Sequence, residues 1–358
     1  MSPDHGFNRA LLKWYDRHRR DLPWRAISGE KPDPYAVLVS ELMLQQTQVA
    51  TVIPYFLRFM ERFPRLVDLA DAPEQEVLRL WQGLGYYSRA RNLQASALII
   101  TRDFGGAVPR NLTELLTLPG VGRYTAGAVA SIAYDQRTPI VDGNIARVLS
   151  RIDRIEADPR SAETIKRLWA RAEQILPAKR AGDFNTAMME LGATVCTPRT
   201  PRCVVCPVRK FCKAAAAGVQ ESIPKSKKAK VTPLNRRLTI CIRNEERWLI
   251  EQRPSIGRWA GMWQFITMEA GAKNPTARQL QTHLGVRVTT PQLMGKLKHA
   301  LTHRRYEFDV YLSNADGDAL SPSDRPRRWI RLQEMSQVPL SRPHSRIVEM
   351  LMARHEEE

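Results

Sequence analysis

The sequence contains no long apolar run, and this absence excludes membrane-spanning proteins. No segment approaches the roughly 18 to 20 consecutive apolar residues of a membrane span, and the N-terminal residues include no apolar signal core. We therefore expect a soluble, cytoplasmic protein with no membrane partner.

Cysteine is also scarce. The chain has five cysteines, an odd number, and four of them lie between Cys196 and Cys212. This distribution excludes the disulfide framework of a secreted protein, whereas a metal site would explain it. The fifth, Cys241, is predicted to be a core residue of a strand.

Acidic residues are in the minority. The 358 residues include 55 Lys and Arg but 37 Asp and Glu, which gives a formal net charge of +18. The excess favours a polyanionic partner, and nucleic acid is preferred to membrane because no basic amphipathic anchor is evident. The length, with 43% hydrophobic residues, predicts roughly two to three domains.

The first part of the chain has the periodicity of helices. From Phe7 to Cys212 no segment has the alternation of a strand. Residues 218–233 are rich in Ser, Pro and Lys, which predicts a solvated linker. We therefore predict an all-α region over residues 1–217.

Beyond the linker the pattern becomes alternating. Leu238–Arg243 and Trp248–Gln252 are predicted strands, and helices are predicted over Pro275–Leu284 and Pro343–Arg354. The second domain, residues 234–358, is therefore predicted to be α+β.

A glycine-rich turn, Leu118–Gly122, is the first candidate for ligand binding. Pro119 stops the helix before it, while Gly120 and Gly122 let the backbone turn with its N–H groups outward, as a phosphate site requires. In isolation the motif would indicate only a tight helical hairpin. With the small residues that follow, it resembles the helix-hairpin-helix of the DNA glycosylases, which implies that Gly120, Gly122 and Thr125 lie at the DNA backbone.

Two carboxylates have contrasting surroundings. Glu41 is placed inside an apolar helix that starts at Pro34. Burial would raise the pKa of its carboxyl, as a general acid at neutral pH requires; the alternative is a glutamate turned toward water. Asp142 opens a later helix, where the N-terminus favours the anion. In the glycosylase superfamily this position holds the catalytic carboxylate.

The clustered cysteines form a second candidate site. Cys196, Cys203, Cys206 and Cys212 have the spacing C-x6-C-x2-C-x5-C. Four thiolates can bind zinc, but structural zinc sites usually contain two C-x2-4-C pairs and this run has one, so a cubane fits better. The spacing resembles the [4Fe–4S] loop of the endonuclease III superfamily, which implies a structural, DNA-positioning cluster held by these cysteines.

Tyr124 distinguishes two reaction types within that superfamily. In the bifunctional members the position after Gly-x-Gly-Arg holds a lysine, whose amine attacks the sugar and leads to strand cleavage. Tyrosine at this position provides no amine nucleophile. The chain is therefore predicted to remove a base without cutting the strand.

Four further motifs carry a closer resemblance; they are Leu22–Arg25, Ser40–Thr47, Gly83–Arg89 and Val141–Arg147. Together they closely resemble the adenine DNA glycosylases of the MutY type, a family that removes adenine mispaired with 8-oxoguanine. The resemblance implies that Glu41 protonates the flipped adenine, while Asp142 stays ionised and stabilises the oxocarbenium-like sugar, with or without a transient covalent adduct.

The same resemblance implies roles for other residues. Tyr124 and Asn144 would position the sugar and Asp142. Arg25 and Glu190 would hold the adenine base. The lesion and the opened base stack would be contacted by Gln46, Thr47, Leu84 and Tyr86.

The second domain resembles a Nudix fold in two segments, Gly261–Phe265 and Ala277–Val286. Nudix hydrolases carry R-E-x-x-E-E-x-G, whose glutamates hold Mg²⁺. The acidic positions here are Gln279, Thr282 and His283. Without carboxylates a hard cation has little to bind, so recognition rather than hydrolysis is predicted.

The resemblance also assigns a lesion-reading loop to this domain. The Phe-Ser-His of the family appears here as Leu301-Thr-His. The hydroxyl and the imidazole remain while the aromatic ring is lost, so Thr302 and His303 are the predicted lesion contacts.

We therefore expect a monofunctional adenine DNA glycosylase of base excision repair that acts on double-stranded DNA containing adenine opposite 8-oxoguanine or guanine. We expect a monomer associated with the bacterial nucleoid. Within the first region, residues 30–136 would form a helical barrel, and residues 1–29 with 137–217 the iron–sulfur domain. The alternatives are a bifunctional glycosylase/lyase, a non-catalytic iron–sulfur DNA-binding sensor and, as a distant third, a Nudix-type nucleotide hydrolase.

Overall fold

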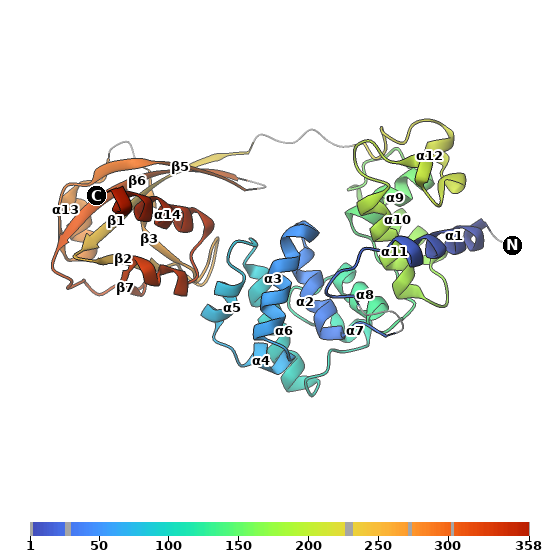
Figure 1. Ribbon diagram of the computed structural model, residues 1–358, viewed down its shortest axis with the longest axis horizontal. Helices are drawn as coiled ribbons and strands as arrows, with labels where there is room; N and C mark the ends of the chain where they lie inside the picture. Colours follow the sequence, from blue (N-terminus) through green and yellow to red (C-terminus); the bar gives the residue numbers. More distant parts are fainter. Residues whose placement is uncertain (1–2, 26–29, 226–231, 271–273, 302–303, 358) are drawn as a thin grey trace. The chain divides into compact units, whose positions relative to one another are not determined.

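The computed structural model describes residues 3–25, 30–225, 232–270, 274–301 and 304–357 (Figure 1). The chain folds into two compact units. One comprises Met1–Asp71 and Asn92–Lys228, and the other comprises Ala72–Arg91 and Ala229–Glu358. No helix among the described residues is both long enough and apolar enough to cross a membrane.

The described residues up to 225 form helices and no strand, which confirms the all-α prediction. The α-helices are α1 Pro3–His18, α2 Pro34–Leu44, α3 Val49–Arg62, α4 Leu66–Ala70, α5 Glu74–Leu80, α6 Ser88–Asp103, α7 Leu112–Leu115, α8 Arg123–Ile132, α9 Gly143–Ile152, α10 Ala162–Ile175, α11 Ala181–Thr194 and α12 Lys213–Ala216. Short 3₁₀ turns lie at Cys203–Val205 and Arg209–Phe211.

Capping side chains start several of these helices. Asp33 accepts hydrogen bonds from the backbone N–H groups of Tyr35 and Ala36, and Pro34 occupies the first position of α2. Asn111 caps α7 and Ser161 caps α10 in the same way. Each cap satisfies backbone donors that the helix leaves unpaired.

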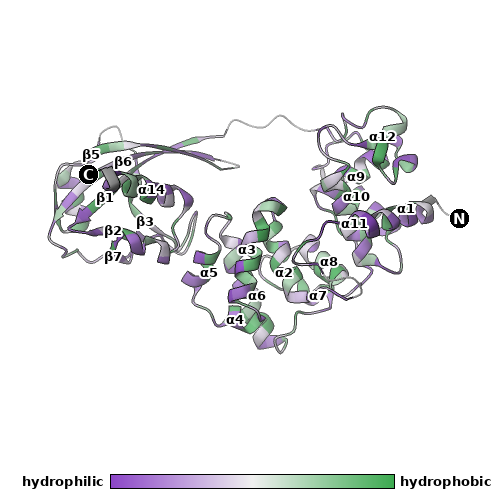
Figure 2. Ribbon diagram, viewed as in Figure 1, coloured by the Kyte–Doolittle hydropathy of each residue, from purple (hydrophilic) through white to green (hydrophobic). Residues whose placement is uncertain are grey.

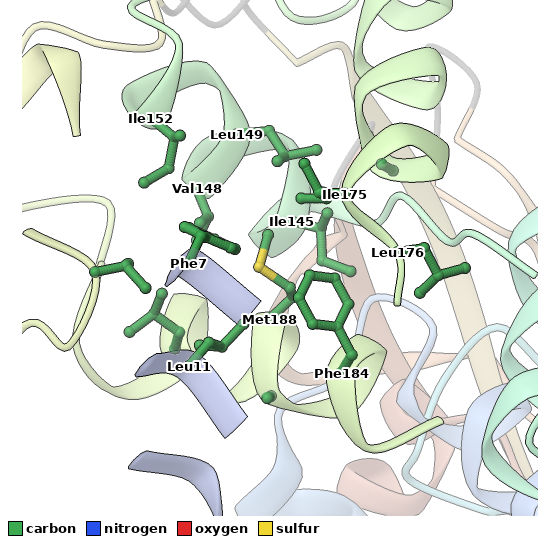
Figure 3. Close-up of a cluster of buried hydrophobic side chains, with 14 of the residues drawn as sticks. Phe7, Leu11, Ile145, Val148, Leu149, Ile152, Ile175, Leu176, Phe184 and Met188 are labelled. Atoms are coloured by element: carbon green, nitrogen blue, oxygen red, sulfur yellow. The ribbon is translucent and has the colours of Figure 1, made fainter. Parts of the chain in front are cut away.

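The core of the first unit lies where α1, α9, α10 and α11 meet. Figure 3 shows Phe7 and Leu11 of α1 facing Phe184 and Met188 of α11. The α9 residues in this cluster recur at helical spacing: Ile145, Val148, Leu149 and Ile152. This packing holds α9, which begins immediately after its capping residue Asp142, against α11.

Two glycines of α11 allow its neighbours to approach closely. A Cβ on Gly192 would lie 2.6 Å from the Cβ of Asn144, at the start of α9. A Cβ on Gly182 would collide with the carbonyl oxygen of Ser131 in α8. The absence of side chains at these positions therefore brings α8 and α9 against α11.

The predicted linker begins inside the folded part of the chain. Ile223 is 1% exposed, and its carbonyl oxygen accepts a hydrogen bond from Arg151. Residues 226–231 lie outside the described part. The buried Ile223 and its hydrogen bond to Arg151 thus extend the first unit beyond residue 217.

The second unit contains a seven-stranded sheet, which confirms the α+β prediction. Its strands are β1 Leu234–Asn244, β2 Arg247–Gln252, β3 Trp263–Glu269, β4 Arg287–Val288, β5 Gln292–Leu301, β6 Arg304–Asp316 and β7 Arg327–Arg331. The order is β4-β6-β1-β3-β2-β7, with β5 also paired to β6. Strands β1 and β6 are parallel, and the other pairs are antiparallel.

A helix packs against each face of this sheet. Leu280 and Leu284 of α13, Ala277–Leu284, pack with Ile240 of β1. Ile347 of α14, Arg342–Glu357, belongs to a second cluster with Cys241. Neighbouring residues of β1 thus face opposite cores, as the pleat requires, and Cys241 is the buried core residue that was predicted.

The close approach at Gly182 predicts the effect of adding one methyl group. Alanine favours a helix over glycine by about 1 kcal/mol, but overpacking against a backbone oxygen typically costs about 1–3 kcal/mol. We expect Gly182→Ala to lower the midpoint of urea unfolding, followed by helical circular dichroism. The control is Gly143→Ala, whose Cβ would meet nothing within 4 Å. Equal midpoints for the two variants would contradict this packing.

Candidate active site

A cavity of about 1220 Å³ lies within the first unit. Ligand pockets typically measure about 300–1,000 Å³, so it has room for a nucleoside-sized ligand. Its walls come from the end of α1 and from α2, α8, α9 and α11. The predicted site residues that line it are Arg25, Glu41, Gln46, Thr47, Tyr124, Asp142, Asn144 and Glu190.

Glu41 lies in α2, which is largely hydrophobic in Figure 2, and is 6% exposed. Burial raises the pKa of its carboxyl to about 7, and the charge of Asp142 adds to the rise. A hydrogen bond with Tyr124 and the charge of Arg25 act in the opposite direction. A substantial fraction of Glu41 is therefore protonated at neutral pH, as predicted for a carboxyl in this apolar helix.

Tyr124 stands at the beginning of α8 and connects two sides of the cavity. Its hydroxyl oxygen lies 3.1 Å from Met189 Sδ and is also hydrogen-bonded to Glu41. Burial raises the pKa of Tyr124 well above its usual value, and the charges of Glu41 and Asp142 raise it further. The phenol therefore stays neutral.

Asp142 caps α9 and is fixed by two hydrogen bonds. Its Oδ1 accepts from the backbone N–H of Ile145 at 2.7 Å, and its Oδ2 accepts from Asn144 Nδ2 at 3.0 Å. Donors at a helix N-terminus stabilise the ionised carboxylate. Glu41 and Asp142 thus face the same cavity with opposite surroundings, one apolar and one rich in donors.

Asn144 connects Asp142 to the cysteine loop through an arginine that the sequence did not single out. Arg147 Nη2 donates to Asn144 Oδ1 at 2.8 Å, and Arg147 Nε donates to the carbonyl oxygen of Cys196 at 2.8 Å. The only hint in the sequence was the spacing of three residues, which places Asn144 and Arg147 on the same face of a helix. The orientation of Asp142 therefore depends on contacts with the loop.

Glu190 is a fully buried carboxylate held by two arginines. Its Oε1 accepts from Arg20 Nε at 2.6 Å, and its Oε2 accepts from Arg25 Nη2 at 2.7 Å. Burial alone would raise the pKa of Glu190, but the bonds and charges of Arg20 and Arg25 lower it below its usual value. Arg20 was missed because it ends a basic run that reads as a solvated helix face.

The glycine-rich turn has exposed glycines, and it is followed by a buried threonine in α8. Gly120 and Gly122 are exposed, and Gly120 has φ of 74°. Thr125, by contrast, is 2% exposed, and its hydroxyl accepts a hydrogen bond from Gln45 Nε2 at 3.3 Å. The Thr125 side chain is therefore buried against the end of α2, and its place at the DNA backbone stays a prediction.

Leu84 and Tyr86 do not line the cavity. They belong to a turn of the second unit in which Gly83, Gly85 and Tyr86 have positive φ. Arg89 Nη2 donates to the carbonyl oxygens of Leu84 and Gly85, and its guanidinium lies 5.5 Å from the Tyr86 ring. Tyr86 is 40% exposed. The predicted lesion contacts Thr302 and His303 lie outside the described residues.

The four clustered cysteines line a second, smaller cavity of the first unit. Its walls also contain three arginines, Arg151, Arg202 and Arg209. No Asp or Glu lines it. Among the described residues, no three His, Cys, Asp or Glu side chains are close enough to hold a single metal ion.

Two protein families match separate parts of the sequence. Residues 39–174 match the HhH-GPD superfamily of base excision DNA repair proteins. Residues 238–350 match the NUDIX domain family. The first match begins within α2, ends within α10 and includes both Glu41 and Asp142.

Similar proteins identify the family. The adenine DNA glycosylase of Rattus norvegicus is 40% identical over 94% of this chain and 76% of its own length. That of Buchnera aphidicola subsp. Baizongia pistaciae is 32% identical over 96% of this chain and 95% of its own length. The chain belongs to the adenine DNA glycosylase family. It is a DNA glycosylase of base excision repair, an enzyme that hydrolyses N-glycosyl bonds.

A solved structure agrees with this assignment. The structure of a thermostable thymine-DNA glycosylase is 31% identical, with a TM-score of 0.53 over 60% of this chain and 97% of that one. The helical fold of this family member is therefore shared with a glycosylase named for another base. The fold alone therefore does not specify which base is removed.

The buried Glu41 carboxyl makes the stability of the glycosylase depend on pH. The pKa of Glu41 is raised to about 7 in the folded state. The contribution of its protonation to the free energy of unfolding is therefore complete below the pKa of the unfolded state and is lost as pH rises through about 7. When the pH is raised from 4 to 8, the free energy of unfolding of wild type should therefore fall, relative to that of Glu41→Gln, by up to about 3 kcal/mol.

Urea unfolding of both proteins at the two pH values measures this difference. Glu61→Gln, which changes an exposed glutamate of α3, is the matched control and should follow wild type. Parallel pH dependences for wild type and Glu41→Gln would show that the Glu41 carboxyl is not desolvated.

Proposed function

We propose that the chain is a monofunctional glycosylase that removes adenine opposite 8-oxoguanine or guanine. The observation that carries the proposal is the pair Glu41 and Asp142 on one cavity, in opposite surroundings and with Tyr124 hydrogen-bonded to Glu41. One carboxyl is suited to give a proton and the other to stay charged. The adenine glycosylases of the family, which are named for this base, support the choice of substrate.

The proposed reaction breaks the bond between the sugar and the base. The bonding electrons leave with adenine while the protonated Glu41 gives its proton to the base. Positive charge develops on the sugar and is stabilised by the Asp142 carboxylate, which Asn144 orients. Water then adds to the sugar carbon and gives its proton to the Glu41 carboxylate, which yields an abasic site and restores the protonated Glu41. Strand cleavage does not follow, because Tyr124 provides no amine.

Recognition of the base is assigned to the group around Glu190. Arg25 is 13% exposed in its side chain, and its guanidinium is oriented by Glu190 Oε2 and by the carbonyl oxygen of Arg20. A buried carboxylate that fixes two guanidinium groups gives the cavity a rigid polar wall. Such a wall can discriminate between bases by their edges.

The cysteine cavity is proposed to hold a [4Fe–4S] cluster. The shared cavity of Cys196, Cys203, Cys206 and Cys212 and its positive surroundings support this cofactor. When bound, the cluster would supply iron–thiolate bonds that cross-link the loop. Hydrolysis itself requires only the groups of the larger cavity.

The second unit is proposed to read the lesion without hydrolysing nucleotides. Helix α13 carries Gln279, Thr282 and His283 where Nudix hydrolases have glutamates. His283 Nε2 lies 2.9 Å from Arg327 Nη2. The positively charged guanidinium of Arg327 thus lies beside a position where a Nudix hydrolase has a glutamate that holds metal. Thr302 and His303 are the proposed lesion contacts, and Leu84 with Tyr86 would enter the base stack. We further propose a monomer associated with the nucleoid in the bacterial cytoplasm.

Base release distinguishes the candidate activities. The full chain should release adenine from a duplex with adenine opposite 8-oxoguanine or guanine and leave an abasic site that is cut only after alkali is added. The relative rates on the two duplexes measure the preference for the lesion. Prompt strand cleavage would instead support a bifunctional glycosylase/lyase, and absence of release with intact binding would support a sensor.

Glu41→Gln separates catalysis from binding. Because an amide cannot protonate the base, single-turnover release should fall by roughly 10²–10⁴-fold while DNA binding is retained. In wild type the rate should decline as pH rises through about 7, since Glu41 then loses its proton. Glu61→Gln should keep the wild-type rate and pH profile. A rate that increases steadily above pH 7 would contradict the assignment of Glu41 as the acid.

A further inference from the structure

Arg151 is a fully buried arginine beside the cysteine cavity, and it is 1% exposed near the end of α9. Its Nε donates to the carbonyl oxygen of Ile223 at 2.8 Å, and its Nη1 donates to that of Thr197 at 2.7 Å. Nη2 donates to the carbonyl oxygen of Pro198 at 3.1 Å, and Nη1 also lies 3.3 Å from Cys196 Sγ. All three nitrogens of the guanidinium are therefore engaged.

These partners satisfy the hydrogen bonds of Arg151 but not its charge. None of the described residues forms an ion pair with it, and no Asp or Glu lines the cavity. A buried arginine is normally paired, because an uncompensated charge is costly in a low-dielectric interior. Arg202 and Arg209 also line the cavity, but they are exposed and their charge is screened by water.

We propose that Arg151 is the fixed counter-charge of the iron–sulfur cluster and that it raises the cluster's reduction potential. The inference rests on the cofactor proposed above. Four thiolates around a [4Fe–4S] core give a group of net negative charge, and Arg151 supplies the missing opposite charge in contact with one ligand sulfur. A positive charge at this distance favours the more reduced, more negative form of the cluster.

Removal of this charge should therefore make the cluster easier to oxidise and to lose. The test uses the full chain purified without oxygen, with the variants Arg151→Met and Arg151→Lys. Iron per chain, the reduction potential by voltammetry, and the loss of visible absorbance under an oxidant with a chelator are measured. Arg154→Met is the matched control, because Arg154 is exposed three residues further along and pairs with Glu156.

Arg151→Met should bind less iron, and the iron it retains should have a lower potential and bleach several-fold faster than in wild type. Arg151→Lys, which keeps the charge but not the fork of donors, should stay close to wild type in potential. Arg154→Met should be unchanged. A role of Arg151 in packing alone would lower thermal stability in both Arg151 variants and leave the potential unchanged.

Two outcomes would overturn the inference. One is a wild-type potential in Arg151→Met, and the other is equal loss of iron in Arg151→Met and Arg151→Lys, since the charge would then be irrelevant. If the wild-type chain purified without oxygen holds no iron, the cofactor proposal fails together with this inference. Adenine release by that same preparation would still stand as the separate test of the glycosylase.

Discussion

The desolvation of the Glu41 carboxyl group determines the electrostatics of the larger cavity. Helix α2 is apolar on nearly every face, so Glu41 has little contact with water and its pKa is raised to about 7. The Tyr124 hydroxyl provides a hydrogen-bond partner, and the neighbouring charge of Asp142 disfavours a second anion. The fold thus holds a desolvated carboxyl and a second carboxylate on the same cavity.

Helix α9 extends from the larger cavity to the cysteine loop. Its first turn is capped by Asp142, and near its other end Arg151 donates to the loop that contains Cys196. Gly192 of α11 lets α9 pack closely at Asn144. Helix α9 and the hydrogen-bonded Arg147 therefore connect the loop with the residues around Asp142.

The elements that the sequence predicted well are those with strong local signals. Helices α2 and α7 begin at capping residues, and β1 alternates between two apolar faces. Strand β3, Trp263–Glu269, was not predicted because both of its faces are largely buried and its residues do not alternate. Helices α4 and α12 span five and four residues, too few for a periodic pattern to be recognised.

By itself, the sequence determined which chemical groups are present: two carboxylates in contrasting helices, four thiols in one loop, and a tyrosine where an amine would be required for strand cleavage. The tertiary structure alone decided how their properties are set. Arg20 and Glu190 are 170 residues apart and yet share a bidentate ion pair, while the hydroxyl of Thr125 points inward. The reason is physical, because pKa values and pairings depend on neighbours and burial that only the packed chain supplies.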